Sequence, residues 1–249
     1  HKWEITKLLP LFGEKIVEPM CTLALDETTE VEVRWFICKV LGKFPHQRVV
    51  LTLVKLLQET RSSELIAIAE KTLIEIGDDA VDALIDLLSQ SKQRVLAVRA
   101  LSYIRTSSTI TPLLEIATAE EPELRTIAIA ALSSFHDARI PPVLITALGD
   151  KTSSVRKEAV IALGFRSDLC QELSLVAQLQ PLLYDLDLEV CRQTAISLGR
   201  MKQTEATTAL FAVLKADTTP ISLKSDLIKA LAWSEKASAI GYLEQGLNN

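Results

Sequence analysis

The stretch VRKEAVIALGFRSD, from Val155 to Asp168, decides the fold. Its apolar residues recur three and four positions apart, which places them on one face of a helix. The small residues Ala159 and Ala162 share that face with Leu163. Small side chains allow another helix to approach closely, so the stretch predicts an amphipathic helix that packs tightly against neighbouring helices.

The same pattern occurs seven times along the chain, in segments 33–44, 65–76, 93–104, 124–135, 155–166, 190–201 and 223–234. Each segment contains a leucine at the same register, namely Leu41, Leu73, Leu101, Leu132, Leu163, Leu198 and Leu231. Successive anchor leucines lie 28 to 35 residues apart. Repeats of this length are typical of solenoids, in which each unit buries its apolar face against its neighbours.

Each repeat is predicted to form two helices of about 10 to 14 residues joined by a polar turn. In the fifth repeat the first helix is PPVLITALG, the turn is DKTSS, and the second helix is the stretch quoted above. Pro141 and Pro142 suit a helix N-terminus, where a missing N–H costs little. The expected fold is an all-α solenoid (superhelix) of helical hairpins, forming one domain over residues 1–249.

Composition agrees with this architecture. The chain has 249 residues, of which 48% are hydrophobic, and it contains only 8 glycines and 9 prolines. An all-β fold with many tight turns would need more of both. No apolar run approaches the roughly 18 residues of a membrane span. The four cysteines form no CxxC pair, which predicts a reducing, cytoplasmic location.

The segments VRKEAVIALGFRSD and LEVCRQTAISLGRMKQTEATTALFAVL resemble HEAT repeats. More narrowly, they are similar to the HEAT-like repeats of phycobilisome lyase and bilin-lyase-like proteins. This resemblance extends over about residues 13 to 247 and implies a solenoid of HEAT-like hairpins. Both ends cut through the repeat, with half-repeats expected at 1–12 and 237–247, so we expect the chain to be a piece of a longer protein.

A ladder of charged residues is predicted to connect adjacent repeats. Position −7 relative to the anchor leucine is basic in five repeats, at Arg34, Arg94, Arg125, Arg156 and Lys224. Acidic residues recur in the turns, among them Asp150, Asp185 and Asp217. The resemblance implies that such pairs join neighbouring HEAT units, and a bidentate Arg–carboxylate pair would fix their stacking angle. A structural role is favoured over a role in ligand binding.

The exposed side of the second helices is predicted at positions −6, −2 and +2. Its basic and aromatic members are Trp35, Lys39, Lys43, Lys71, Arg99, Tyr103, Lys157, Phe165, Arg192, Arg200, Lys229 and Trp233, and its one acidic member is Glu75. By analogy with HEAT solenoids this stripe would line the concave side. Two interpretations stay open: a binding groove with aromatic anchors, or a solvated face with a chance bias in charge.

Catalytic and metal-binding motifs are absent from the sequence. The three histidines, His1, His46 and His136, belong to no HExxH or Cys/His cluster, and no nucleotide-binding glycine motif occurs. The sequence therefore predicts no catalytic residue, metal or cofactor. A net charge of −5 also argues against duplex DNA as a partner.

Two functions are consistent with these features. The first is a non-catalytic scaffold that holds an acidic segment of another protein in the stripe. The second, implied by the resemblance to bilin lyases, is a lyase-like or chaperone-like role in handling a linear tetrapyrrole for phycobiliprotein assembly. The propionates and extended π-system of a tetrapyrrole could bind basic and aromatic side chains, but many proteins with this repeat bind no pigment.

Overall fold

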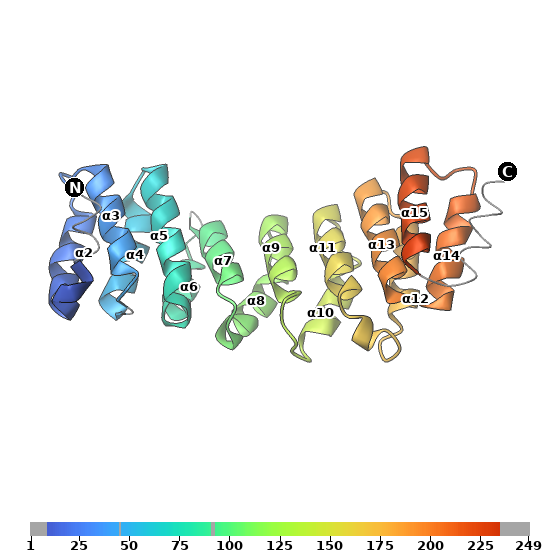
Figure 1. Ribbon diagram of the computed structural model, residues 1–249, viewed down its shortest axis with the longest axis horizontal. Coiled ribbons are helices and arrows are strands. Elements are labelled where there is room, and N and C mark those ends of the chain that lie inside the picture. The colour runs from blue at the N-terminus through green and yellow to red at the C-terminus, as the bar shows by residue number, and fades with distance from the viewer. Residues whose placement is uncertain (1–8, 45, 91–92, 235–249) are drawn as a thin grey trace. The chain divides into compact units, whose positions relative to one another are not determined.

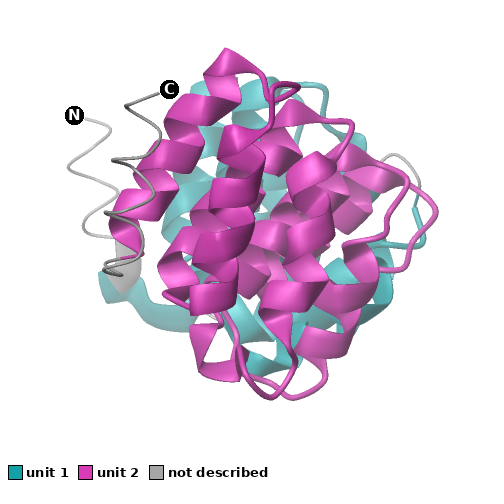
Figure 2. Ribbon diagram, turned by 90° about the vertical axis from the view of Figure 1, so that its right-hand side faces the viewer, with its two compact units in different colours: residues 1–116 teal, residues 117–249 magenta. Residues whose placement is uncertain are grey.

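The computed structural model describes residues 9–44, 46–90 and 93–234, and within these ranges it contains helices and turns but no strand (Figure 1). The all-α class predicted from the repeat is therefore confirmed. Residue contacts divide the chain into two compact units, residues 1–116 and 117–249 (Figure 2). The boundary falls inside the fourth predicted repeat, and the single continuous domain expected from the sequence stays a prediction.

Unit 1 contains three helical hairpins and the first helix of a fourth. Its elements are the 3-10 helix η1 (Leu9–Ile16), α2 (Val17–Leu25), α3 (Val31–Leu41), α4 (Gln47–Glu59), α5 (Ser63–Ile76), η2 (Gly77–Ala80), α6 (Val81–Leu87), α7 (Arg94–Tyr103), η3 (Ser107–Thr109) and α8 (Ile110–Ile116). The second helices α3, α5 and α7 pack in that order, and so do the first helices α2, α4 and α6.

Unit 2 continues with α9 (Pro122–Leu132), α10 (Ile140–Ala147), α11 (Ser153–Gly164), η4 (Ser167–Leu169), α12 (Leu175–Leu179), η5 (Gln180–Tyr184), α13 (Leu188–Met201), α14 (Thr204–Lys215) and α15 (Ile221–Trp233). The second helices α9, α11, α13 and α15 form a row in which each packs against the next (Figure 1). The half-repeat expected at 237–247 lies outside the described residues.

The anchor leucines form the centre of each unit. All seven have no exposed surface, and so do Ala69, Ala97, Ala128 and Ala159 at position −4. Fully burying one leucine side chain contributes about 2 kcal/mol, so this register accounts for a large part of the stability of the stack. The face predicted from VRKEAVIALGFRSD is therefore the packed face.

The first helices of the middle repeats are shorter than the predicted 10 to 14 residues. Helices α6 and α8 have 7 residues each and α10 has 8. Each of α6 and α8 follows a 3-10 turn that takes up the start of the apolar segment. In the sixth repeat the first helix is divided between α12 and η5, with Pro181 at the start of η5.

Two glycines set how closely the second helices of unit 2 approach. A Cβ atom added at Gly164 would lie 2.7 Å from the Cβ atom of Ser197 on α13. A Cβ atom at Gly199 would lie 2.6 Å from the carbonyl oxygen of Ala230 on α15. Both distances are too short for carbon, so these helices touch at positions where only glycine fits.

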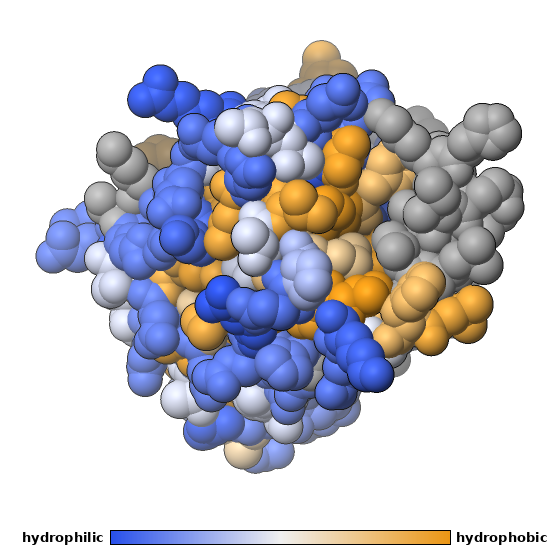
Figure 3. Space-filling view, turned by 90° about the vertical axis from the view of Figure 1, so that its left-hand side faces the viewer, coloured by the Kyte–Doolittle hydropathy of each residue, from blue (hydrophilic) through white to orange (hydrophobic). Residues whose placement is uncertain are grey.

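The end of unit 1 that includes η1 and α2 exposes apolar side chains, which gather near the centre of the face drawn in Figure 3. The most exposed of them on these elements are Leu11, Phe12 and Leu23. Apolar surface at the end of a stack follows from the repeat itself, because every unit is built to pack against a neighbour. No helix in the described part of the chain is both long enough and apolar enough to cross a membrane.

Candidate interaction surface

The charged ladder of unit 2 is built from two bidentate ion pairs. Arg125 on α9 donates to Asp150 through Nε and Nη2, both at 2.8 Å, and Arg156 on α11 donates to Asp185 through the same two nitrogens, both at 2.7 Å. Each aspartate lies in the turn before the next second helix. The pairs thus join one repeat to the next, as the sequence pattern predicts.

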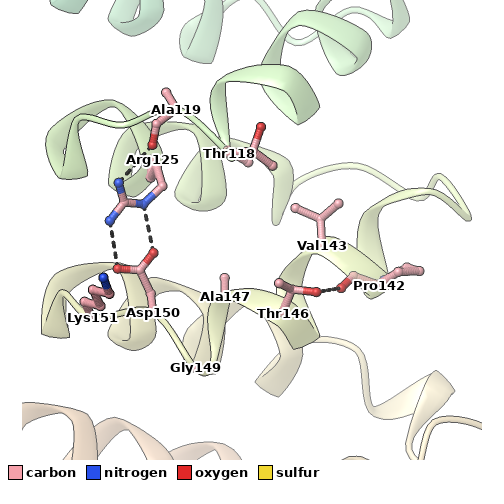
Figure 4. Close-up of a pocket in the computed structure, with 11 residues that line it drawn as sticks. Thr118, Ala119, Arg125, Pro142, Val143, Thr146, Ala147, Gly149, Asp150 and Lys151 are labelled. Atoms are coloured by element: carbon pink, nitrogen blue, oxygen red, sulfur yellow. Dashed lines mark hydrogen bonds and ion pairs between the residues drawn. The ribbon is translucent and has the colours of Figure 1, made fainter.

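The third nitrogen of each guanidinium fixes the turn before its own helix. Nη1 of Arg125 donates to the carbonyl oxygen of Ala119 at 2.9 Å (Figure 4), and Nη1 of Arg156 donates to that of Asp150 at 2.8 Å. The carboxylate of Asp150 accepts a further hydrogen bond, from the backbone amide of Thr152 at 2.8 Å. All the main hydrogen-bonding groups of the pairs are thus engaged, which favours a structural role over ligand binding.

The electrostatics of the pairs agree with this role. Burial alone raises the pKa of Asp150 and Asp185, but hydrogen bonds from Arg125 and Arg156 and from backbone amides outweigh it, so both pKa values are lowered. The same hydrogen bonds raise the pKa of Arg125 and Arg156. Both partners are therefore held in their charged forms.

The remaining predicted ladder residues are Arg34, Arg94, Lys224 and Asp217. Arg34 is buried, but its Nε donates to the carbonyl oxygen of Ala24 at 2.8 Å instead of to a carboxylate of the next repeat. Arg94 is half-buried at the start of α7. Lys224 is half-buried on α15, and Asp217 is exposed in the turn before that helix. The two bidentate pairs described above both lie in the middle of unit 2.

Cys191 replaces arginine in the sixth repeat. Its Sγ atom donates to the carbonyl oxygen of Asp185 at 3.2 Å, six residues earlier, as Arg156 does to Asp150. The short thiol cannot also reach the next repeat. That connection is made by Arg192, whose Nε lies 3.2 Å from a carboxylate oxygen of Asp226 on α15.

A pocket of about 570 Å³ in unit 2 lies beside the Arg125–Asp150 pair, between the start of α9 and helix α10 (Figure 4). Val143, Thr146 and Ala147 of α10 form much of its wall. The guanidinium and carboxylate at its rim bond to each other and to the backbone, Lys151 lies beside them, and most of the remaining lining is apolar.

Unit 1 has a second pocket, of about 610 Å³, that the sequence reading missed. Four aspartates from one face of η2 and α6 line it, namely Asp78, Asp79, Asp82 and Asp86. Their spacing in DDAVDALID is the signal that could have indicated a shared face. In the part of the chain that the structure describes, no group of His, Cys, Asp and Glu side chains is arranged to hold a metal ion.

The stripe of unit 1 consists of Trp35, Lys39, Lys43, Lys71, Arg99 and Tyr103 on α3, α5 and α7, with Lys43 in the turn after α3. All are exposed except Trp35, which is half-buried, and Tyr103 is 60% exposed. The ammonium of Lys39 lies 5.5 Å from the centre of the Trp35 ring. Lys71 pairs with Glu75 at 3.9 Å on the same helix. Glu70 lies close enough to Arg99 to interact with it, although burial raises the pKa of this carboxyl.

The stripe of unit 2 consists of Lys157, Phe165, Arg192, Arg200, Lys229 and Trp233 on α11, α13 and α15, with Phe165 directly after the end of α11. Phe165 and Trp233 are 60% and 47% exposed. Lys157 lies 3.6 Å from Glu158, Arg192 contacts both Glu189 and Asp226, and Lys229 lies 3.5 Å from Asp226. Acidic residues next to the stripe thus neutralise part of its charge. These acidic residues lie outside positions −6, −2 and +2, so the pattern that defines the stripe does not include them.

The four cysteines are free thiols buried in the units. Burial raises the pKa of all four, and it raises that of Cys38 to about 12. They act as small apolar side chains, as the sequence predicts.

Comparison with known proteins agrees with the fold. The model for HEAT repeats matches residues 18–103, 90–164, 110–178 and 141–232. No curated protein sequence matches the chain. The narrower resemblance to phycobilisome lyases is not shown by these comparisons.

Among solved structures, an engineered protein is 22% identical, with a TM-score of 0.55 over 92% of this chain and 71% of its own. YibA of E. coli is 18% identical, with a TM-score of 0.58 over 100% of this chain and 91% of its own. Kap121p bound to Nup53p is 16% identical, with a TM-score of 0.64 over 97% of this chain and 32% of its own. These likenesses concern the fold, and the family model settles the membership: the chain belongs to the HEAT repeat family.

Proposed function

We propose that the protein is a non-catalytic scaffold that binds another protein through the stripes of its second helices. The observation that carries the proposal is the exposure of aromatic rings among cations, with Tyr103 and Phe165 each 60% exposed. Large aromatic side chains are costly to leave in water and supply much of the energy at interfaces. Lysine and arginine beside them favour an acidic segment of the partner.

The fold supports this proposal in a general way. Within each unit, stacked hairpins present a row of second helices, which suits an extended segment of a partner. One solved structure with this fold, Kap121p, has the protein Nup53p bound to it. Because that likeness concerns the fold alone, the partner of this chain has to be recognised by the chemistry of its own stripe. A cytoplasmic location is part of the same proposal, since the four thiols are free.

A matched pair of charge reversals tests the proposal. In the first variant the exposed stripe cations Lys39, Lys43, Lys71 and Arg99 are all changed to glutamate. In the control variant four exposed cations away from the stripe are changed in the same way, namely Lys15, Arg48, Lys55 and Arg61. Both variants change the net charge equally, so nonspecific electrostatic effects are the same in both.

The immobilised proteins are incubated with lysate of the source organism, and bound proteins are identified by mass spectrometry. The proposal predicts a partner that binds the wild type and the control variant but is lost from the stripe variant. Equal capture of every bound protein by all three would refute the role of the stripe.

A visible absorption spectrum of the eluate and a titration with a free bilin test the tetrapyrrole hypothesis, which predicts a protein-bound, red-shifted band.

A further inference from the structure

Three residues of unit 2 occupy the same position, two residues after the anchor leucine, on successive second helices. They are Phe165 after α11, Arg200 on α13 and Trp233 at the end of α15. Each follows closely on a helix contact that is fixed by a small residue, because Gly164 touches Ser197 and Gly199 touches Ala230. Because α11 packs on α13 and α13 packs on α15, the shared register places the three residues at corresponding points of consecutive helices, and we call them the 165–200–233 row.

Arg200 differs from the other cations of its stripe. Lys157, Arg192 and Lys229 each lie within 4 Å of a carboxylate. Arg200 is exposed and, among the described residues, forms no ion pair; its guanidinium carbon lies 5.1 Å from the centre of the Phe165 ring. The row therefore offers one cation that is not neutralised, held against an exposed aromatic ring.

This geometry leaves the edge of the guanidinium available. A guanidinium that stacks on a ring still presents its N–H donors in a planar fork, which matches the two oxygens of a carboxylate. Stacking also restricts the arginine side chain before binding, which lowers the entropy cost of forming the new hydrogen bonds. The exposed faces of Phe165 and Trp233 on either side can cover an apolar side chain of the same ligand.

Resting on the proposed function, we infer that the 165–200–233 row is the anchor point for the partner and that it binds a short acidic segment with an apolar side chain. One carboxylate of the segment accepts two hydrogen bonds from Arg200. A neighbouring phenylalanine or leucine of the segment packs on Phe165 and Trp233. Charge complementarity sets the partner: Arg200 is the one cation of the row, whereas Lys157, Arg192 and Lys229 of the same stripe already lie beside carboxylates.

The test uses the complete chain and fluorescently labelled, capped pentapeptides. The probes are Asp-Glu-Phe-Asp-Glu and Asp-Glu-Leu-Asp-Glu, and the matched probe without charge is Asn-Gln-Phe-Asn-Gln. Binding is followed by fluorescence anisotropy at low and high salt. We expect both acidic peptides to bind at least tenfold more tightly than the neutral one, and this preference to weaken as salt screens the charges.

Variants locate the site. Arg200→Gln should weaken binding of the acidic peptides about tenfold. Arg200→Lys should bind them more tightly than Arg200→Gln but less tightly than the wild type, because an ammonium lacks the planar fork of donors. Phe165→Ala and Trp233→Ala should each weaken binding several-fold. The control Lys151→Gln removes the same charge from an exposed turn of unit 2 and should leave binding unchanged. Circular dichroism establishes that each variant is folded.

Equal affinity for acidic and neutral peptides, or binding that Arg200→Gln leaves unchanged, would overturn the inference. The proposed function would survive that result if the charge-reversed stripe of unit 1 still lost its partner. Loss of the lysate partner on Arg200→Gln, with retention by Lys151→Gln, would instead support both.

Discussion

At the scale of single residues, the pair of Arg156 and Asp185 holds two repeats of unit 2 together. Their side chains are only 15% and 9% exposed, so water competes weakly for the charges. Asp185→Asn keeps the shape but leaves a poorly solvated guanidinium without its carboxylate. We expect a loss of about 2 kcal/mol in the free energy of unfolding, measured by urea denaturation.

The control for this substitution is Asp137→Asn. Asp137 also bonds to an arginine, Arg139, but the two lie in one turn and Arg139 is 53% exposed. Water screens an ion pair with so exposed a partner, so its loss should cost less than that of Asp185. Equal effects of the two substitutions would show that the ladder does not carry the stacking energy.

The same carboxylates predict the dependence of stability on pH. Because the folded pKa values of Asp150 and Asp185 are lowered, their contribution is present above the unfolded value of about 4 and is lost as pH falls through the folded values. Urea midpoints measured from pH 7 down to pH 2 should therefore fall below about pH 4. The Asp185→Asn variant should show a shallower fall, and an identical slope would contradict the assignment.

The buried thiols give a further prediction at this scale. All four cysteines are at most 4% exposed, and burial raises their pKa values, so little reactive thiolate is accessible. A thiol reagent such as Ellman's reagent should label none of them quickly in the native protein and all four after unfolding. Rapid labelling of the native protein at pH 8 would contradict this packing.

At the scale of helices, glycine determines the spacing between α13 and α15. Gly199→Ala would bring a methyl group into the backbone of Ala230, which cannot move aside as a flexible side chain can. We expect a loss of about 1 to 3 kcal/mol in unfolding free energy, as is typical of overpacking. Gly149→Ala is the control, since its Cβ atom would meet only the carbonyl oxygen of Thr146, at an ordinary 3.7 Å.

The helix pattern also shows what the sequence could predict. All seven anchor leucines are fully buried. The sequence predicts this because apolar residues recur with the helical period of about 3.6 residues, and the same face recurs in every repeat of about 30 residues. The lengths of the first helices were predicted less well, since 3-10 turns replaced their first residues in α6 and α8. Such turns depend on local hydrogen bonds, and the spacing of apolar residues contains no information about those bonds.

The exposure of the aromatic stripe residues could be predicted from the sequence, but the net charge around them could not. Exposure of Tyr103, Phe165 and Trp233 follows from their place opposite the packed face. The acidic partners of Lys157 and Lys229 come from Glu158 and Asp226, which lie just beside the stripe in sequence. Which neighbours reach a long cation depends on side-chain conformation, and a position count contains no such information.

At the scale of the whole molecule, the central proposal is that the partner binds the stripes of the second helices. Photo-crosslinking tests it most directly, with benzoylphenylalanine placed at Tyr103 and Phe165 on the stripes and, as controls, at Leu51 on α4 and Tyr184 on η5. All four positions are at least half exposed, so substitution should not disturb folding.

After irradiation in lysate of the source organism, crosslinked products are compared by mass spectrometry. We expect one and the same protein to be crosslinked at Tyr103 or Phe165 and to be absent at Leu51 and Tyr184. Attachment of that protein mainly at Leu51 or Tyr184 would place binding on the first helices and contradict the account.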